Sequence, residues 1–198
     1  MSRHSSQSLS KEDQRKLLEI ARRAIVEAIL HERAWVPTES LGALMEPRGV
    51  FVTLRLRGAL RGCIGRVESP EPLAHGAARC AVAAATEDAR FRRLQTEEIS
   101  AVLIEISVLS DLEPIRPHEI EIGRHGLMVF HGSHSGILLP QVAVDHQWTP
   151  QRFLQETCEK AGLPREAWKS PETRIRGFTA GHFSEADLAL GAFTIATR

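Results

Sequence analysis

The sequence has few cysteines, no tyrosine or asparagine, no net charge and no long apolar run, and these shortages argue against several classes of protein. Only three of its 198 residues are cysteine, and none of them forms a Cys-x-x-Cys pair. That usage argues against a disulfide scaffold and against a structural zinc site. We therefore expect a reducing, cytoplasmic location, with no metal and no cofactor.

The composition also gives little support to a membrane or a nucleic acid as a partner. No apolar run approaches the roughly 18 residues of a membrane span, and the serine-rich N-terminus lacks the apolar core of a secretory signal. The 25 basic residues are matched by 25 acidic ones, and aromatic residues make up only 5% of the chain. Nucleic-acid binding needs a surplus of phosphate-neutralising groups or a series of stacking rings, and the composition provides neither.

What the sequence does contain is a regular alternation of apolar residues. Residues 50–56 alternate between apolar and more polar positions, which is the pattern of a strand with one buried face. Gly58-Ala59 then reads as a tight turn, after which Leu60, Gly62 and Ile64 resume the apolar parity. The segment therefore predicts a β-hairpin with one face in the core.

On the second strand of this hairpin a cysteine stands between two glycines. The parity places Arg61 and Cys63 on the outward face beside Arg55, because cross-strand neighbours lie only about 5 Å apart. Positive neighbours favour the thiolate form, and Gly62 and Gly65 would let a ligand approach the main chain closely. These residues predict a nucleophilic or ligand-binding cysteine with an anion pocket. The plainer alternative is an inert side chain in a bent strand.

A later strand and a helix end add further candidates. Residues 102–109 alternate as well, so Glu105 and Ser107 would line the same pocket if their strand shares the outward face with Cys63. Glu105 would then serve as a general base or simply neutralise the arginines. Asp88 lies at a helix C-terminus, where the helix dipole disfavours a carboxylate, and Arg90 is close enough to pair with it. A functional residue and a salt-bridged loop both fit that pattern.

The remaining patterns define the fold class. We expect helices at about 11–32, 69–88 and 149–162, further strands at 126–131, 137–140 and 174–183, and a five-residue turn at 132–136. Helices and antiparallel hairpins follow one another without a regular βαβ rhythm. This order predicts an α+β protein with a mainly antiparallel sheet and flanking helices.

Several of these segments carry a family resemblance. Residues 49–54, followed by Leu60-Arg61-Gly62-Cys63-Ile64-Gly65, resemble the AMME-syndrome candidate gene 1 protein family, whose prokaryotic members are called AmmeMemoRadiSam system protein A. Further matching segments are 88–91, 105–109, 126–127, 139–142 and 160–163. The resemblance covers residues 10–184 and leaves 1–9 as a polar tail and 185–198 as a C-terminal extension.

The resemblance implies more about fold than about activity. It implies two unequal lobes of sheet and helix, with the cysteine motif between or near them. It also implies a functional association with a Memo-type protein and a radical S-adenosylmethionine protein. The family has no settled biochemical activity, so the resemblance assigns no role to any single residue.

Three functions therefore remain open. The first is a cytoplasmic enzyme, or enzyme component, in which Cys63 acts as a nucleophile or covalent carrier on an anionic small molecule or a protein carbonyl, in a pocket lined by Arg55, Arg61 and Glu105. The second is a non-catalytic regulatory module that binds a partner protein or an anionic ligand through the same face. The third, a nucleic-acid-binding regulator, ranks last because the sequence shows no basic face and no helix-turn-helix signal.

Overall fold

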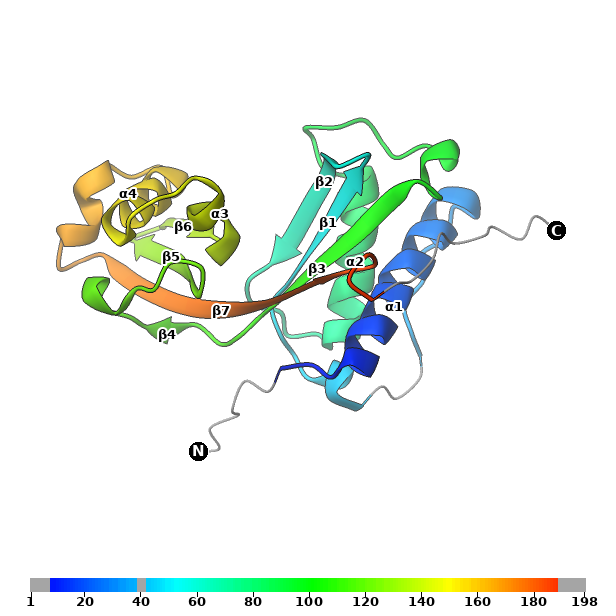
Figure 1. Cartoon of the computed structure of the whole chain (residues 1–198), viewed down its shortest axis with the longest axis horizontal. Coiled ribbons are helices and arrows are strands. Elements are labelled where there is room, and N and C mark those ends of the chain that lie inside the picture. The colour runs from blue at the N-terminus through cyan, green and yellow to red at the C-terminus, as the bar shows by residue number, and fades with distance from the viewer. Residues whose placement is uncertain (1–7, 39–41, 189–198) are drawn as a thin grey trace. The chain divides into compact units, whose positions relative to one another are not determined.

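A computed structural model describes residues 8–38 and 42–188, which fold into two compact units of unequal size (Figure 1). The first unit takes in the described residues up to Leu109 and those from Gly181 onward, and the second is Ser110–Ala180. Strand β7 (Arg174–Ser184) contributes to both units. Within the described residues, no helix is both long and apolar enough to cross a membrane.

The first unit is built on antiparallel strands in the order β2-β1-β3, followed by the end of β7. The strands are β1 (Val50–Leu56), β2 (Ala59–Arg66) and β3 (Val102–Leu109). Helices α1 (Lys11–Leu30) and α2 (Leu73–Thr86) cover one face of this sheet (Figure 1). The apolar parity predicted for residues 50–54 faces those helices, and Val50, Val52 and Leu54 are fully buried there.

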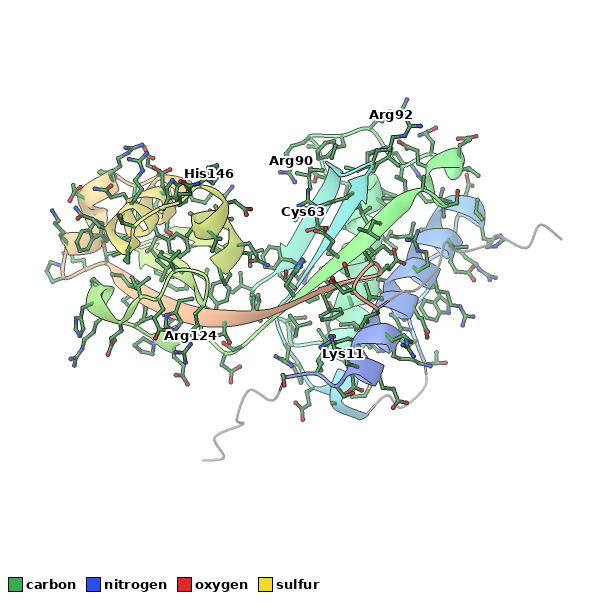
Figure 2. The ribbon with its side chains drawn as sticks, in the orientation of Figure 1. Lys11, Cys63, Arg90, Arg92, Arg124 and His146 are labelled. Atoms are coloured by element: carbon green, nitrogen blue, oxygen red, sulfur yellow. The ribbon has the colours of Figure 1, made fainter. Side chains whose placement is uncertain are left out.

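The start of α1 follows from its sequence. Ser10 caps the helix by accepting a hydrogen bond from the Asp13 backbone N–H, and α1 begins at Lys11, which is labelled in Figure 2. A smooth alanine face on α2 lets that helix lie close to both α1 and the sheet. The predicted helix pattern is confirmed here, with ends that differ by a few residues.

The hairpin differs from the prediction in its turn and in one register shift. The turn lies at Arg57-Gly58, both with positive φ, rather than at Gly58-Ala59. The pairing shifts between Leu54 and Arg55, because Gly62 pairs with Leu54 while Leu60 pairs with Arg55. Arg61 is thus the extra residue of a β-bulge. The prediction that Leu60 shares the buried face is wrong, since the bulge reverses its parity and leaves it 37% exposed.

The second unit holds β4 (Glu113–Pro114), β5 (His125–His131), β6 (His134–Leu138) and the first part of β7. Helices α3 (Pro140–Asp145) and α4 (Pro150–Lys160) complete this unit, and α4 packs Phe153 and Leu154 into its core.

The predicted five-residue turn at 132–136 is wrong, because the β5–β6 ladder continues to the His131–His134 pair and leaves only Gly132-Ser133 as the turn. The α+β class, the antiparallel sheet and the two unequal lobes are confirmed.

In the part of the chain that the structure describes, four short 3₁₀ helices connect these elements. They are η1 (Gly42–Met45), η2 (Thr96–Glu98), η3 (Pro117–Glu119) and η4 (Arg165–Lys169). The predicted extension 185–198 lies mostly outside the described residues, but its first residue, Glu185, is buried in the first unit.

Candidate functional site

The register of three strands places the candidate residues on the sheet face opposite the helices. Thr53 on β1 lies directly across from Cys63 on β2 and from Glu105 on β3. Cross-strand partners present their side chains on the same face, so these three residues form one row. In the neighbouring row, Phe51 lies between Gly65 and Ser107. The structure thus brings Cys63 and Gly65 of β2 and Glu105 and Ser107 of β3 onto a single surface of the first unit.

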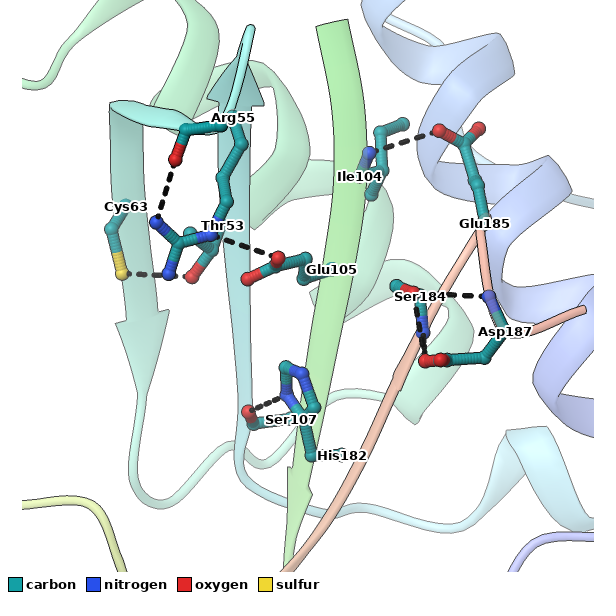
Figure 3. Close-up of polar contacts among 11 residues, drawn as sticks. Thr53, Arg55, Cys63, Ile104, Glu105, Ser107, His182, Ser184, Glu185 and Asp187 are labelled. Atoms are coloured by element: carbon teal, nitrogen blue, oxygen red, sulfur yellow. Dashed lines mark hydrogen bonds and ion pairs between the residues drawn. The ribbon is translucent and has the colours of Figure 1, made fainter. Parts of the chain in front are cut away.

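Cys63 is held by its side chain and by its backbone. The Thr53 hydroxyl donates to the thiol sulfur at 3.3 Å (Figure 3), and the thiol itself is half-buried. The Cys63 backbone N–H donates to Asp88 Oδ2 at 2.8 Å, and its carbonyl accepts from Arg90 Nη2 at 3.4 Å. Strand β2 forms the edge of the sheet, so side chains take the place of a neighbouring strand at this residue.

Asp88 is the buried centre of this arrangement. It is 7% exposed, and besides the Cys63 N–H it accepts the Arg90 Nε at 2.9 Å, the Arg90 Nη2 at 2.7 Å and the Arg90 backbone N–H at 3.2 Å. The Arg90 guanidinium, followed by the Cys63 N–H, holds the pKa of the Asp88 carboxyl well below its usual range against the effect of burial. The ion pair between Asp88 and Arg90 that the sequence predicts is therefore present in the structure.

A second ion pair joins β1 to β3. Arg55 Nε donates to Glu105 Oε1 at 2.8 Å, and Arg55 Nη1 reaches the Gly58 carbonyl at 3.4 Å (Figure 3). The Arg55 side chain is 40% exposed and the Glu105 side chain only 15%. Of the two roles considered for Glu105, the geometry favours holding Arg55 over acting as a general base, since its closest partner is the guanidinium.

Two residues of this face were missed by the sequence reasoning. Thr53 shares the outward parity of Arg55, and that parity was the signal that could have found it. His182 contacts Ser107 through its Nδ1, 3.3 Å from the Ser107 hydroxyl oxygen (Figure 3). No local signal points to His182, because its place depends on the pairing of β7 with β3 over a long sequence separation.

Arg61 does not present its charge to Cys63. Its guanidinium donates to both carboxylate oxygens of Glu98, at 3.1 and 2.8 Å, and to the carbonyls of Arg92 and Arg93, at 2.8 and 3.3 Å. The side chain is only 10% exposed. The bulge accounts for this, since it takes Arg61 out of the regular alternation on which the prediction depended. The residue fastens β2 to the loop after α2.

The two glycines beside Cys63 serve different contacts. A Cβ at Gly62 would lie 2.1 Å from the Ala84 carbonyl oxygen of α2, so this glycine permits close packing of helix on sheet. A Cβ at Gly65 would lie 2.2 Å from the Phe51 ring and 2.7 Å from the Val50 carbonyl oxygen. Gly62 thus faces the core, whereas Gly65 accommodates the Phe51 ring on the outward face. A glycine is needed at position 62 because β2 packs closely against α2, and not because a ligand approaches the backbone there.

The other two cysteines lie in the cores. Burial raises the pKa of the Cys80 thiol to about 11, and it also raises the pKa of the Cys158 thiol. Cys63 is therefore the half-buried member of the three. Over residues 8–38 and 42–188, no three His, Cys, Asp or Glu side chains gather as metal ligands.

Comparison with known proteins places this architecture in a family. The family model described as AMMECR1 matches residues 18–183, which include the second unit, most of the first and every residue of the outward face named above. The chain belongs to the AMMECR1 family.

AMMECR1-family relatives match over nearly their whole length. Protein TK0174 of Thermococcus kodakarensis is 41% identical over 181 residues, covering 85% of this chain and 88% of that protein. Protein PF1979 of Pyrococcus furiosus is also 41% identical over 181 residues, covering 85% of this chain and 86% of that protein. The crystal structure of the uncharacterized protein PH0010 from Pyrococcus horikoshii superposes with a TM-score of 0.84 at 38% identity, covering 89% of this chain and 93% of that one. The names of these relatives state no activity.

Proposed function

We propose that this AMMECR1-family protein is an enzyme, or an enzyme component, that uses Cys63 as a nucleophile on a small molecule carrying an anionic group. The observation that supports this proposal most is that, around the thiol, the positive groups are exposed and the negative groups are buried. The guanidinium groups of Arg55 and Arg90 are 40% and 58% exposed, while the carboxylates of Glu105 and Asp88 beneath them are only 15% and 5% exposed. Each ion pair thus turns its positive end towards solvent.

Although each ion pair has no net charge, its outward guanidinium attracts an anion more strongly than its buried carboxylate repels it. An anion about 3.5 Å from a guanidinium and about 6.5 Å from its carboxylate is attracted by about 2 kcal/mol at an effective dielectric constant of about 20. Solvent screening of exposed groups reduces this to about 1 kcal/mol. That is enough to orient a ligand beside Cys63, although not enough to bind it tightly without further contacts.

The chemistry assigned to Cys63 is nucleophilic displacement. The thiolate sulfur forms a bond to an electrophilic carbon of the substrate, the leaving group departs with the electron pair of the broken bond, and the thiol proton passes to solvent. The Thr53 hydroxyl, which donates to the sulfur, orients the Cys63 side chain on the outward face. Glu105 and Asp88 act as positioning residues in this proposal, because each holds a guanidinium in place.

A non-catalytic binding module is the second candidate, and one observation favours it. Within the described residues, the thiol is hydrogen-bonded to Thr53 and no histidine ring nitrogen contacts it. A site without an adjacent base fits recognition of an anionic ligand or a partner protein as well as it fits catalysis. In that case Arg55 and Arg90 would supply the contacts and Cys63 would only fill space.

A Cys63→Ser variant separates the two candidates. We expect the wild-type protein to convert at least one anionic metabolite when it is incubated with a cell extract, and we expect Cys63→Ser to lose that conversion because a hydroxyl is a far weaker nucleophile than a thiolate. Metabolites are measured by mass spectrometry before and after incubation. Cys80→Ala, which changes a buried cysteine, is the matched control and should convert normally.

The alternative gives a different result in the same experiment. A binding module would retain a metabolite through gel filtration with the wild type and Cys63→Ser alike, and would convert none. An extract from which nothing is consumed or retained would contradict both candidates.

The family resemblance adds partners to the proposal. We propose that this protein acts in the cytoplasm together with a Memo-type protein and a radical S-adenosylmethionine protein. The third function, nucleic-acid regulation, gains no support from the site. Its outward cations are paired with carboxylates, whereas phosphate-backbone binding needs a surplus of unpaired ones.

A further inference from the structure

Arg90 is exposed, is held in place by several contacts and reaches the backbone of Cys63. Asp88 binds it through Nε and Nη2, and the guanidinium lies over the Phe91 ring, 5.5 Å from its centroid. Nη2 also reaches the Cys63 carbonyl. Two edges and one face of the guanidinium are therefore occupied, although the side chain is 58% exposed.

The remaining nitrogen of Arg90 is the one suited to a ligand. Among the described residues, Nη1 has no hydrogen-bond partner, and its two N–H groups are left to solvent. Arg61, by contrast, uses Nε, Nη1 and Nη2 within the protein. Arg55 also leaves one nitrogen, Nη2, but it is held by one bond to Glu105 and one to Gly58, whereas Asp88 binds Arg90 through two nitrogens and Arg90 also reaches Cys63 itself. A guanidinium whose rotamer is already fixed loses little conformational entropy when a ligand binds.

We infer that Arg90 is the specificity-determining residue of the Cys63 site, that Asp88 positions it, and that it binds a carboxylate group of the ligand. This inference rests on the proposed function, to which it adds the ligand class. A carboxylate is favoured over a phosphate because the two ion pairs leave no surplus positive charge. Such a site attracts a monoanion through the orientation of its pairs, whereas a dianion loses more hydration than they return.

The backbone of Cys63 supports the same assignment. Its N–H is already given to Asp88 and is therefore not available to a ligand. Asp88 thus removes one donor from the site and provides another by fixing Arg90. Arg90 Nη1 is the donor that this pair of residues leaves for a ligand oxygen, and Nη2 of the same guanidinium reaches the Cys63 carbonyl.

Two alkylating reagents of similar size test the inference directly. Iodoacetate carries a carboxylate and iodoacetamide does not, and both react by forming a carbon–sulfur bond to the Cys63 sulfur while iodide leaves with the electron pair. The ratio of their rates at Cys63, read by peptide mass spectrometry, reports carboxylate recognition with the neutral reagent as internal reference. We expect Arg90→Gln to lower this ratio about 5-fold.

Arg92→Gln is the matched control, because Arg92 is a neighbouring arginine that is 76% exposed and, unlike Arg90, extends away from Cys63 (Figure 2). It should leave the ratio unchanged. Arg90→Lys keeps the charge without the planar fork and should recover part of the preference, which covers the case in which Arg90→Gln folds poorly. Acetate should slow the iodoacetate reaction more than sodium chloride of equal ionic strength does, and inorganic phosphate should not.

The outcomes separate this inference from the proposed function. If Cys63 reacts with iodoacetamide but the ratio is the same in the wild type, Arg90→Gln and Arg92→Gln, the assignment of Arg90 is overturned and the reactive cysteine stands. Stronger protection by phosphate than by acetate would overturn the carboxylate class. If Cys63 does not react with iodoacetamide at all, the proposed function itself fails.

Discussion

Replacing Glu185 by glutamine is expected to lower the free energy of unfolding by about 3–5 kcal/mol, because it leaves the buried Arg22 charge without its counter-ion. Arg22 is 4% exposed and Glu185 8%, and the two carboxylate oxygens accept from Arg22 Nε and Nη2. Glu185 Oε2 also accepts from the Ile104 backbone N–H at 2.9 Å (Figure 3). The pair therefore ties the end of β7 to α1 and to β3.

The measurement is chemical denaturation of Glu185→Gln and of a surface control. Glu121 pairs with Arg124 in the second unit, where both side chains are about 60% exposed. Glu121→Gln should change stability by less than about 1 kcal/mol, since exposed pairs contribute little. If the two substitutions lowered the free energy of unfolding equally, the buried ion pair of Arg22 and Glu185 would not stabilise the fold as described.

The second large effect is expected at Gly62. An alanine there places its Cβ 2.1 Å from the Ala84 carbonyl oxygen, which belongs to the backbone of α2 and cannot rotate away. The helix must shift off β2, and we expect Gly62→Ala to destabilise the protein by about 3 kcal/mol. Thermal and chemical denaturation measure this loss directly.

Gly76→Ala is the matched control for that substitution. Gly76 lies within α2 at the same helix–sheet interface, and its added Cβ meets only a Val50 side-chain carbon at 3.3 Å. Alanine favours a helix interior by about 1 kcal/mol over glycine, which offsets the tight contact, so stability should change little. If Gly62→Ala were well tolerated, close packing would not explain this glycine, and the predicted role of letting a ligand approach the backbone would stand.

The sequence predicted what depends on local periodicity. The alternation of residues 50–56 and 102–109 identified both strands and the face that lines the core, and Ser10 identified the start of α1. Asp88 was found through a broken local rule, a carboxylate at a helix C-terminus, and its partner was close in sequence. Local patterns suffice when both members of an interaction lie within a few residues.

The rest required information that local patterns do not carry. The bulge at Arg61 depends on how two strands settle against each other, and one extra residue reversed the parity of Leu60 and redirected a guanidinium. The partners of Ser107 and Arg22 are His182 and Glu185, 75 and 163 residues away in the chain. Contacts between residues so far apart in the chain depend on β7 packing beside β3, and no sequence motif predicts that packing.

The proposed function requires Cys63 to be an available, reactive thiol, and the rate of iodoacetamide labelling of each cysteine in the folded protein tests this. We predict that Cys63 is modified at least about 10-fold faster than Cys80 and Cys158 near neutral pH, because burial raises the thiol pKa of both and closes them off. Labelling of Cys63 as slow as that of the two core cysteines would contradict the account, and would leave the outward face of β1, β2 and β3 as a structural surface.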